Sequence, residues 1–280
     1  MAHRAGAKGM QPNPVNTPDK NIESARSFAV DLAKAASETI RRDFAWRTET
    51  EKKVDGTDVT STDKVVNAMI INAVNKEFPN HDIFGEEKSD MTRKSSYVWV
   101  CDPLDGTTVF SKGIPTFSFA LSLVINGTPN IGVIADSSGR MYVGMLGKGS
   151  FLDGERLHVS KHDRLEKALI GISSWKGEQI SLIKMPEKLR SEGAGFLDLG
   201  SIASMGALVS CGNMTASVHP ADKPWESAAL KVIVTEAGGR VTDLYGNEQR
   251  YDREIRGGII SNGLIHDELL RLVRSCGNSQ

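Results

Sequence analysis

Apolar residues recur with the period of a helix in the first third of the chain. They do so over residues 22–40 and again over residues 65–74. The second run follows Ser61-Thr62-Asp63, which is typical of a helix N-terminus, and it stops before Pro79, which cannot continue a helix. The pattern therefore predicts two amphipathic helices separated by a polar stretch.

In the middle of the chain the period changes to that of strands. Residues 81–84 and 97–101 are short runs rich in β-branched and aromatic side chains. Three further runs follow, at residues 117–125, 131–135 and 141–145. The turn dipeptides Asn126-Gly127 and Ser138-Gly139 separate them and are typical of hairpins. We therefore expect an antiparallel meander.

Helical and strand-like segments alternate in the second half. We expect strands at residues 168–172, 214–218, 241–244 and 258–261, helices at residues 201–210, 225–237 and 266–273, and a polar helical region before Arg190. Such a mixture favours helices layered on sheets, that is, an α/β (α+β) fold. We divide the chain into a flexible tail at residues 1–20, an N-terminal α+β half at residues 21–160 with the acidic motifs, and a C-terminal α/β half at residues 161–280 that completes the site.

Composition narrows the classes of function. The 280 residues include 34 Lys and Arg and 35 Asp and Glu, so the formal net charge is −1. This balance leaves no surplus for the basic face that nucleic acid requires, and we predict no nucleic-acid partner. No window approaches the roughly 18 consecutive apolar residues of a membrane span, so we predict no membrane partner. Three cysteines without metal or disulfide spacing favour a reducing compartment, the cytoplasm.

The densest group of chemically useful residues is Asp102-Pro103-Leu104-Asp105-Gly106-Thr107-Thr108. It follows an apolar strand directly, so its two carboxylates can face one cleft, where hard divalent cations take oxygen ligands. Gly106 permits a close approach of the backbone, and the N–H groups of Gly106 and Thr107 can form a nest for an anion. The alternative is an Asx turn, in which Asp102 and Asp105 only cap backbone amides.

Two further acidic clusters stand at the ends of predicted elements. Glu86 and Glu87 lie just beyond the strand at residues 81–84, and Glu226 lies at the start of the helix at residues 225–237. Glu226 alone is also explained by the favourable interaction of an acidic residue with a helix N-terminus. Three separated acidic clusters at element ends favour a carboxylate site for more than one metal ion.

Taken together, the motifs resemble those of a known family. Gly85-Glu86-Glu87, the 102–108 segment, Trp225-Glu226-Ser227-Ala228-Ala229 and Glu236-Ala237-Gly238-Gly239 match in order and spacing the inositol monophosphatase-like superfamily of magnesium-dependent, lithium-sensitive phosphomonoesterases. The resemblance extends over residues 22–273. It implies a layered αβαβα sandwich of the inositol monophosphatase/fructose-1,6-bisphosphatase type, two to three Mg²⁺ ions per active site, and a homodimer.

The resemblance also implies roles for individual residues. Glu86, Asp102, the carbonyl of Leu104 and Thr107 would bind the first metal ion, and Asp102, Asp105 and Glu226 the second. Asp63 would pair with the Thr107 hydroxyl to activate the attacking water, and Glu86 would also face a third, weaker metal site. Phosphate and substrate contacts would come from Asp105, Gly106, Thr107, Gly200, Ser201, Ile202, His219 and Glu226, and Lys53 would lie near the phosphate. On the residues alone, Asp63 is explained as a helix N-terminal charge and Lys53 as a solvated lysine.

Several positions depart from the family's pattern, among them Val109 and Lys112, which replace the asparagine and histidine usual after the 102–108 motif. Glu226 stands where the family has aspartate, and the added methylene lengthens its reach by roughly 1.5 Å. His219 stands where inositol monophosphatases carry a glutamate that contacts an inositol hydroxyl, although a lone histidine beside Pro220 is also explained as a surface or turn residue. Thr108 replaces the lysine typical of the branch that acts on nucleotide phosphates.

These observations predict a Mg²⁺-dependent phosphomonoesterase that hydrolyses a small polyol or sugar phosphate, such as an inositol 1-phosphate, by metal-activated water. The alternatives within the family are histidinol-phosphate and aminosugar-phosphate phosphatases. An alternative of another class is a catalytically weak binding or regulatory homologue, which Glu226 and His219 suggest. A calcium-binding structural protein is disfavoured because the acidic residues are dispersed rather than gathered in one loop of about 12 residues.

Overall fold

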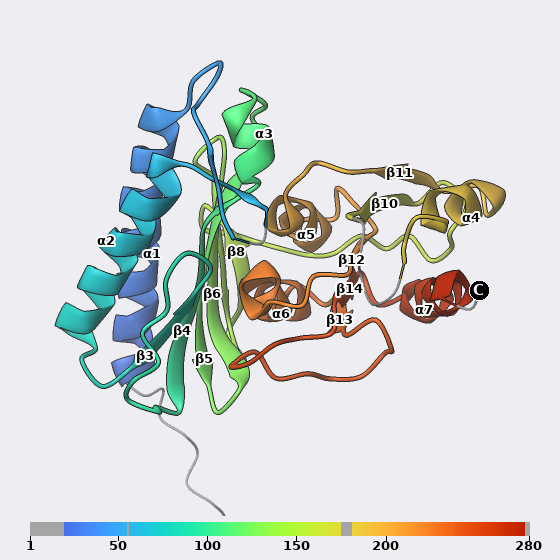
Figure 1. Ribbon diagram of the computed structural model, residues 1–280. Coiled ribbons are helices and arrows are strands. Elements are labelled where there is room, and N and C mark those ends of the chain that lie inside the picture. Colours follow the sequence, from blue (N-terminus) through green and yellow to red (C-terminus); the bar gives the residue numbers. More distant parts are fainter. Residues whose placement is uncertain (1–19, 55, 175–180, 278–280) are drawn as a thin grey trace, which may run out of the picture.

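Helices and sheets alternate in five layers in the computed structural model (Figure 1). The structure describes residues 20–54, 56–174 and 181–277. The flexible tail predicted for residues 1–20 therefore lies, except for its last residue, outside the described ranges. From one side of the molecule to the other, the order is a helix pair, a large sheet, a second helix pair, a small sheet and a third helix pair. This arrangement confirms the predicted αβαβα sandwich.

The first helix pair is α1 (Lys20–Asp43) and α2 (Ser61–Glu77), as the apolar period predicted. Helix α2 is capped by Thr60 rather than by one of the three residues that follow it, because Thr60 and Asp63 form a capping box. Between the two helices the chain makes the short antiparallel strands β1 (Glu51–Lys52) and β2 (Asp58–Val59).

A seven-stranded sheet packs against this helix pair. Its strands follow the order β3 (Asp82–Gly85), β4 (Tyr97–Asp105), β5 (Ser118–Ile125), β6 (Thr128–Asp136), β7 (Met141–Met145), β8 (Gly149–Leu152) and β9 (Glu155–Arg156). Strands β3 and β4 are parallel and all later pairs are antiparallel, which confirms the meander. Asn126 and Gly127 have φ values of 52° and 85°, the left-handed conformations that a tight two-residue hairpin requires. The short helix α3 (Thr107–Ser111) follows β4.

The middle layer consists of α5 (Ile202–Ser210) and α6 (Ala228–Glu236). The sequence predicted one helix over residues 225–237, but the structure has a 3₁₀ turn, η1 (Pro224–Glu226), and a break at Ser227, whose φ and ψ are −146° and 1°. Helix α6 lies very close to the large sheet, since a Cβ on Gly132 would come within 2.5 Å of the Ala229 carbonyl oxygen. This close packing brings η1 to the carboxyl end of β4, which it contacts.

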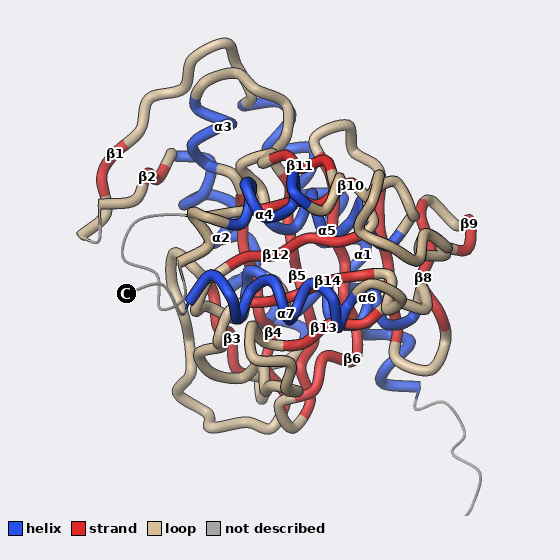
Figure 2. Tube along the Cα trace, turned by 90° about the vertical axis from the view of Figure 1, so that its right-hand side faces the viewer, coloured by secondary structure: helices blue, strands red, loops and turns tan. Residues whose placement is uncertain are grey.

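A five-stranded sheet and the last helix pair complete the fold. The strands follow the order β11 (Gly195–Leu197), β10 (Leu169–Ile172), β12 (Ala216–His219), β14 (Gly258–Ser261) and β13 (Arg240–Thr242). Strand β11 was not predicted, because three residues carry too short a pattern. Helices α4 (Met185–Ser191) and α7 (His266–Gly277) cover the outer face of this sheet, as Figure 2 shows. Among the described residues, no helix combines the length and the apolar character needed to cross a membrane.

Candidate active site

Three carboxylates from two distant parts of the chain meet at one point. Asp102 and Asp105 lie at the end of β4, and Glu226 lies on η1. Each offers an oxygen atom, and these atoms all lie within 4.8 Å of one another. They line a cleft of about 260 Å³, which also includes Glu86, Leu104, Gly106, Thr107, Gly200 and Ile202 among the predicted site residues. The structure therefore brings most of the predicted site together.

The end of β4 is irregular, and this irregularity lets both aspartates face the cleft. The register between β4 and β5 shifts between Asp102 and Asp105. The Leu104 N–H donates a hydrogen bond of 3.0 Å to Asp102 Oδ1, which is the Asx turn considered as an alternative. That turn uses one carboxylate oxygen. The turn and the carboxylate cluster therefore coexist.

The electrostatics of this cluster fit divalent metal ions. Burial, and then the charges of Glu86, Asp105 and Glu226, raise the pKa of Asp102 well above its usual value. Burial and the charges of Asp105 and Glu86 do the same to the pKa of Glu226. Converging anions that are costly to keep ionised, with only oxygen donors, are the environment that Mg²⁺ and similar hard cations prefer. The residues present thus fit the metal ions that the sequence implies.

Asp105 is held by the N-terminus of α5. Its Oδ2 atom accepts hydrogen bonds from Ser201 Oγ at 2.5 Å and from the Ala203 N–H at 2.7 Å. Burial raises the pKa of Asp105 to about 6, although these two hydrogen bonds act in the opposite direction. Ser201 is only 1% exposed and is not among the described residues that line the cleft. The hydroxyl of Ser201, which the resemblance predicts at the substrate, supports Asp105 in this structure.

Asp63 performs two tasks at once. Its Oδ2 atom accepts the Thr60 N–H at 2.8 Å and so caps helix α2, while its Oδ1 atom accepts the Thr107 hydroxyl at 3.0 Å. Thr107 Oγ1 also lies 3.1 Å from the Leu104 carbonyl oxygen. Burial raises the pKa of Asp63, and the hydrogen bonds from Thr60 and Thr107 oppose this shift. Both interpretations of Asp63, as a helix cap and as the partner of Thr107, are therefore compatible with its contacts.

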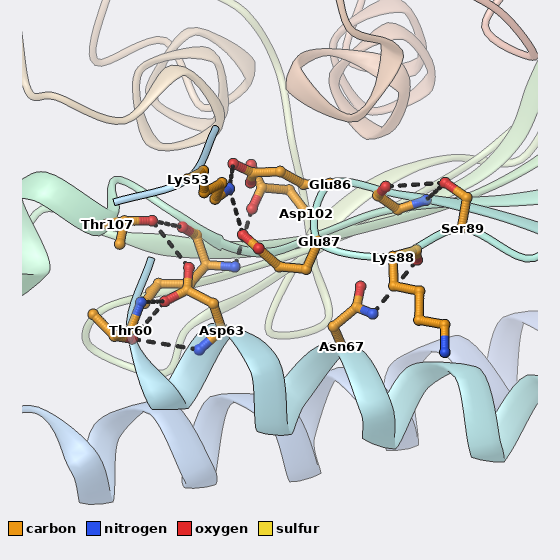
Figure 3. A network of polar contacts seen from close by, with 12 residues as sticks. Lys53, Thr60, Asp63, Asn67, Glu86, Glu87, Lys88, Ser89, Asp102 and Thr107 are labelled. Carbon is orange, nitrogen blue, oxygen red and sulfur yellow. Dashed lines mark hydrogen bonds and ion pairs between the residues drawn. The ribbon is translucent and has the colours of Figure 1, made fainter. Parts of the chain in front are cut away.

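A lysine lies between two glutamates at the side of the cleft, as Figure 3 shows. Lys53 Nζ lies 2.7 Å from Glu86 and 2.6 Å from Glu87. Its side chain is 18% exposed, so it is not the solvated lysine considered as an alternative. Burial alone would lower the pKa of Lys53, but the two glutamates outweigh it and the pKa is raised. Glu86 faces the cleft, although it is not one of the three carboxylates that converge most closely.

A glycine stands at the turn from β4 into α3. Gly106 has a φ of 92°, a left-handed conformation that glycine adopts readily, and it precedes the first residue of α3. A Cβ at this position would lie 3.0 Å from the Gly200 carbonyl oxygen, so the two predicted substrate segments touch here. The backbone of Gly106 and Thr107 thus borders the cleft next to the carboxylates.

His219 lies elsewhere than expected. It is 0% exposed and is not among the described residues that line the cleft, so it is not a surface residue and does not border the cleft. Neither ring nitrogen has a hydrogen-bond partner among the described residues, and burial lowers its pKa to about 3. The ring is buried because His219 lies on β12 opposite Gly258 and packs over this glycine. A Cβ on Gly258 would come within 2.4 Å of His219 Nε2. The ring is therefore a neutral, buried group.

Five residues that sequence reasoning did not single out also line the cleft. They are Thr57, Asp58, Ser173, Ser174 and Asp198. Thr57 and Asp58 belong to the polar stretch before α2, and Ser173 and Ser174 follow β10. None of them belongs to a recognisable motif, and only the position of the serines at a strand end was a usable signal.

The fold and the site define a layered α/β protein with a cluster of carboxylates that could hold metal ions. Residues 21–278 match the family model described as the inositol monophosphatase family. The chain belongs to this family, which is metal-dependent and whose characterised relatives are phosphatases, that is, phosphoric monoester hydrolases.

Relatives of known name and structure extend over most of the chain. It is 34% identical over 248 residues to the fructose-1,6-bisphosphatase/inositol-1-monophosphatase of Thermotoga maritima, with 88% of this chain and 94% of that protein covered. It is 31% identical over 235 residues to inositol monophosphatase 1 of Bos taurus, with 80% and 85% covered. The solved structure of a Thermotoga maritima IMPase matches with a TM-score of 0.82 and 31% identity, over 90% of this chain and 98% of that one.

Proposed function

We propose that the protein is a Mg²⁺-dependent phosphomonoesterase that hydrolyses a small polyol or sugar phosphate of the inositol 1-phosphate kind. The observation that carries the proposal is the convergence of Asp102, Asp105 and Glu226 within 4.8 Å at a cleft bordered by the backbone of Gly106. An anionic ester can enter such a cleft only when cations offset the carboxylates. The family membership supports the same reaction class.

The residues that would hold Mg²⁺ form two overlapping sets. Glu86, Asp102, the Leu104 carbonyl and Thr107 would hold one ion, and Asp102, Asp105 and Glu226 a second; Glu86 would also face a third. When bound, the ions supply the positive charge that attracts the phosphate dianion, acidifies a bound water and stabilises the leaving alkoxide.

The protein's own side chains would orient the attacking water. The Thr107 hydroxyl can donate its single hydrogen bond to Asp63 Oδ1, 3.0 Å away, which leaves a lone pair of the Thr107 oxygen free to accept a hydrogen bond from the attacking water. Asp63 is buried and fixed by Thr60, so it holds this direction firmly. The N–H groups of Gly106 and Thr107 would hold the phosphate in line with that water.

The rest of the cleft would receive the alcohol part of the substrate. Gly200 and Ile202 border it, together with the hydroxyls of Ser173 and Ser174 and the exposed carboxylate of Asp198. These polar groups can hydrogen-bond to the hydroxyls of a polyol. The volume of about 260 Å³ suits a small substrate rather than a large one.

We further infer that the enzyme works as a homodimer in the cytoplasm. The resemblance to the family supports the dimer. The cysteines support a reducing compartment, since Cys101, Cys211 and Cys276 are all unpaired.

A phosphate-release assay tests the proposed reaction. The purified protein is supplied with Mg²⁺ or with EDTA and a panel of inositol 1-phosphate, fructose 1,6-bisphosphate, glucosamine 6-phosphate and histidinol phosphate. We expect release with Mg²⁺ only, inhibition by lithium, and the highest kcat/KM for a polyol or sugar phosphate. Preference for histidinol phosphate or the aminosugar phosphate would assign one of the alternatives within the family. Failure to release phosphate from any ester would contradict the proposal and favour a binding or regulatory role.

A further inference from the structure

Helix α2 contacts the site at a second residue, one turn after Asp63. Asn67 lies four residues further on, so it shares a helix face with Asp63. It is only 3% exposed, and its Nδ2 atom donates a hydrogen bond of 3.4 Å to the Lys88 carbonyl oxygen. Figure 3 shows Asp63 and Asn67 projecting from α2 toward the layer that carries Glu86 and Asp102. The same helix thus contacts two separate segments of the candidate active site.

The segment that Asn67 contacts is the tight turn after β3 that carries Glu86. On one side, the Glu86 N–H donates to the Cys101 carbonyl oxygen at 3.2 Å, which attaches the turn to β4. Within the turn, Ser89 Oγ accepts from the Gly85 N–H at 3.2 Å and lies 3.1 Å from the Gly85 carbonyl oxygen. On the opposite side, the turn packs against α2.

Asn67 packs closely against this turn at Gly85. A Cβ on Gly85 would lie 2.8 Å from the Lys88 carbonyl oxygen and 2.9 Å from Asn67 Oδ1. The Asn67 amide therefore lies next to the backbone on both sides of Glu86, at Gly85 and at Lys88.

The stability of α2 does not explain an asparagine at this position. Asn67 Oδ1 is buried and has no hydrogen-bond partner among the described residues. A buried acceptor without a partner is destabilising, and an apolar side chain of similar size would avoid it. What the asparagine does provide is its hydrogen bond to Lys88.

We propose that Asn67 is a positioning residue that fixes the Glu86 turn relative to Asp102 and so preorganises the metal site. This inference rests on the proposed function, because Glu86 is taken there as a residue that would hold Mg²⁺. Neighbours that orient metal ligands in this way commonly change metal affinity about 10- to 100-fold when they are removed.

The test is a calorimetric titration of Mg²⁺ into the substrate-free protein, for the wild type, Asn67→Leu and Asn75→Leu. Asn75 is a matched control, because it is a half-buried asparagine two turns further along α2. It contacts Asp90 and Arg93 and is not among the described residues that line the cleft. Thermal unfolding of all three proteins in EDTA separates an effect on metal affinity from an effect on stability.

We expect Asn67→Leu to weaken Mg²⁺ binding roughly tenfold and Asn75→Leu to leave it within about twofold. In EDTA, the melting temperature of Asn67→Leu should fall no further than that of Asn75→Leu. In the phosphatase assay, the Mg²⁺ concentration for half-maximal activity should rise for Asn67→Leu, while kcat at saturating Mg²⁺ is largely recovered. If Asn67→Leu does not fold, Asn67→Ala, which introduces no larger group, provides the same comparison.

Two results would overturn the inference. One is unchanged Mg²⁺ affinity in the Asn67 variant, and the other is an equal loss of affinity in the Asn75 variant. A wild-type protein that binds no Mg²⁺ would instead overturn the proposed function, and this inference with it. The two failures are therefore distinguishable.

Discussion

The two sides of the cleft are built in different ways. On the side of the seven-stranded sheet, Asp102, Asp105 and Thr107 lie within six consecutive residues, and local hydrogen bonds to and from Leu104 shape them. On the other side, Gly200 and Glu226 are far apart in sequence and come together only because α5 and α6 pack between the two sheets. The first side is thus encoded locally, and the second depends on the packing of layers.

Asp105 joins the two sides. It belongs to β4, yet its closest hydrogen bonds come from Ser201, the N-cap of α5, and from Ala203 in the first turn of that helix. Its pKa of about 6 reflects burial opposed by these donors. A substitution of Asp105 should therefore disturb both sides of the cleft, whereas a substitution of another site residue should disturb only the side to which it belongs.

The largest effect is therefore expected for Asp105→Asn. This variant removes a charge from the carboxylate cluster while keeping the size of the side chain, and we expect kcat to fall by about 10²–10³-fold. The melting temperature in EDTA should fall only modestly, because the amide loses one acceptor for the donors at the start of α5 but no longer buries an ionisable group among other carboxylates. The measurements are phosphate release and thermal unfolding. A large drop in melting temperature would show that the loss of activity came from unfolding.

The second-largest effect is expected for Thr107, which belongs only to the side of the cleft that follows β4. Thr107→Val keeps the shape of the side chain but removes the hydroxyl that bonds to Asp63, and we expect kcat to fall by about 10²-fold or more. Thr128→Val is the matched control, since Thr128 is exposed on β6 and is not among the described residues that line the cleft. Equal activity of the two variants would contradict the proposed orientation of water by Thr107.

The two sides of the cleft also differ in how well the sequence predicted them. The 102–108 motif predicted Asp102, Asp105 and Thr107 at one cleft, and hydrophobic periodicity predicted most of the helices and the meander. The capping sequence before α2 placed Asp63 at a helix start, although the cap proved to be Thr60. A short sequence motif is therefore enough to predict a part of the structure that hydrogen bonds between neighbouring residues shape.

The features that were missed depend on contacts between distant segments. The break at Ser227 lies where η1 contacts β4, and no residue near it is a helix breaker after Pro224. The burial of His219 follows from its pairing with Gly258 across two strands. Ser201 and Asp105 are 96 residues apart, so their hydrogen bond had no signal in the sequence. Tertiary packing decided each of these features.

A smaller effect concerns the competition between protons and metal. Burial and neighbouring charges raise the pKa of Asp102, Asp105 and Glu226, so these groups are protonated at a higher pH than ordinary carboxylates, with Asp105 at about 6. Mg²⁺ must displace those protons, and its binding should therefore weaken as pH falls through this range. We expect the rise in melting temperature caused by Mg²⁺ to be larger at pH 7.5 than at pH 5. An equal rise at both values would contradict the assignment of Mg²⁺ to these carboxylates.

The smallest effect is expected for His219→Leu. The ring is buried, neutral and without a hydrogen-bond partner among the described residues, so an apolar replacement loses no contact with substrate. We expect unchanged KM and a change in stability of about 1 kcal/mol or less, because a buried polar group without partners contributes little. Steady-state kinetics and thermal unfolding check both. A clear rise in KM would contradict this prediction and would show that His219 contributes to substrate binding.

The central claim is that Glu226, on the side built by packing, completes the metal site begun by β4. It is tested most directly by calorimetric titration of Mg²⁺ into the wild type and Glu226→Ala. We predict that the variant loses one binding event or binds that ion at least tenfold more weakly, as expected for the removal of a ligand. A titration of Glu226→Ala that is indistinguishable from that of the wild type would contradict the claim.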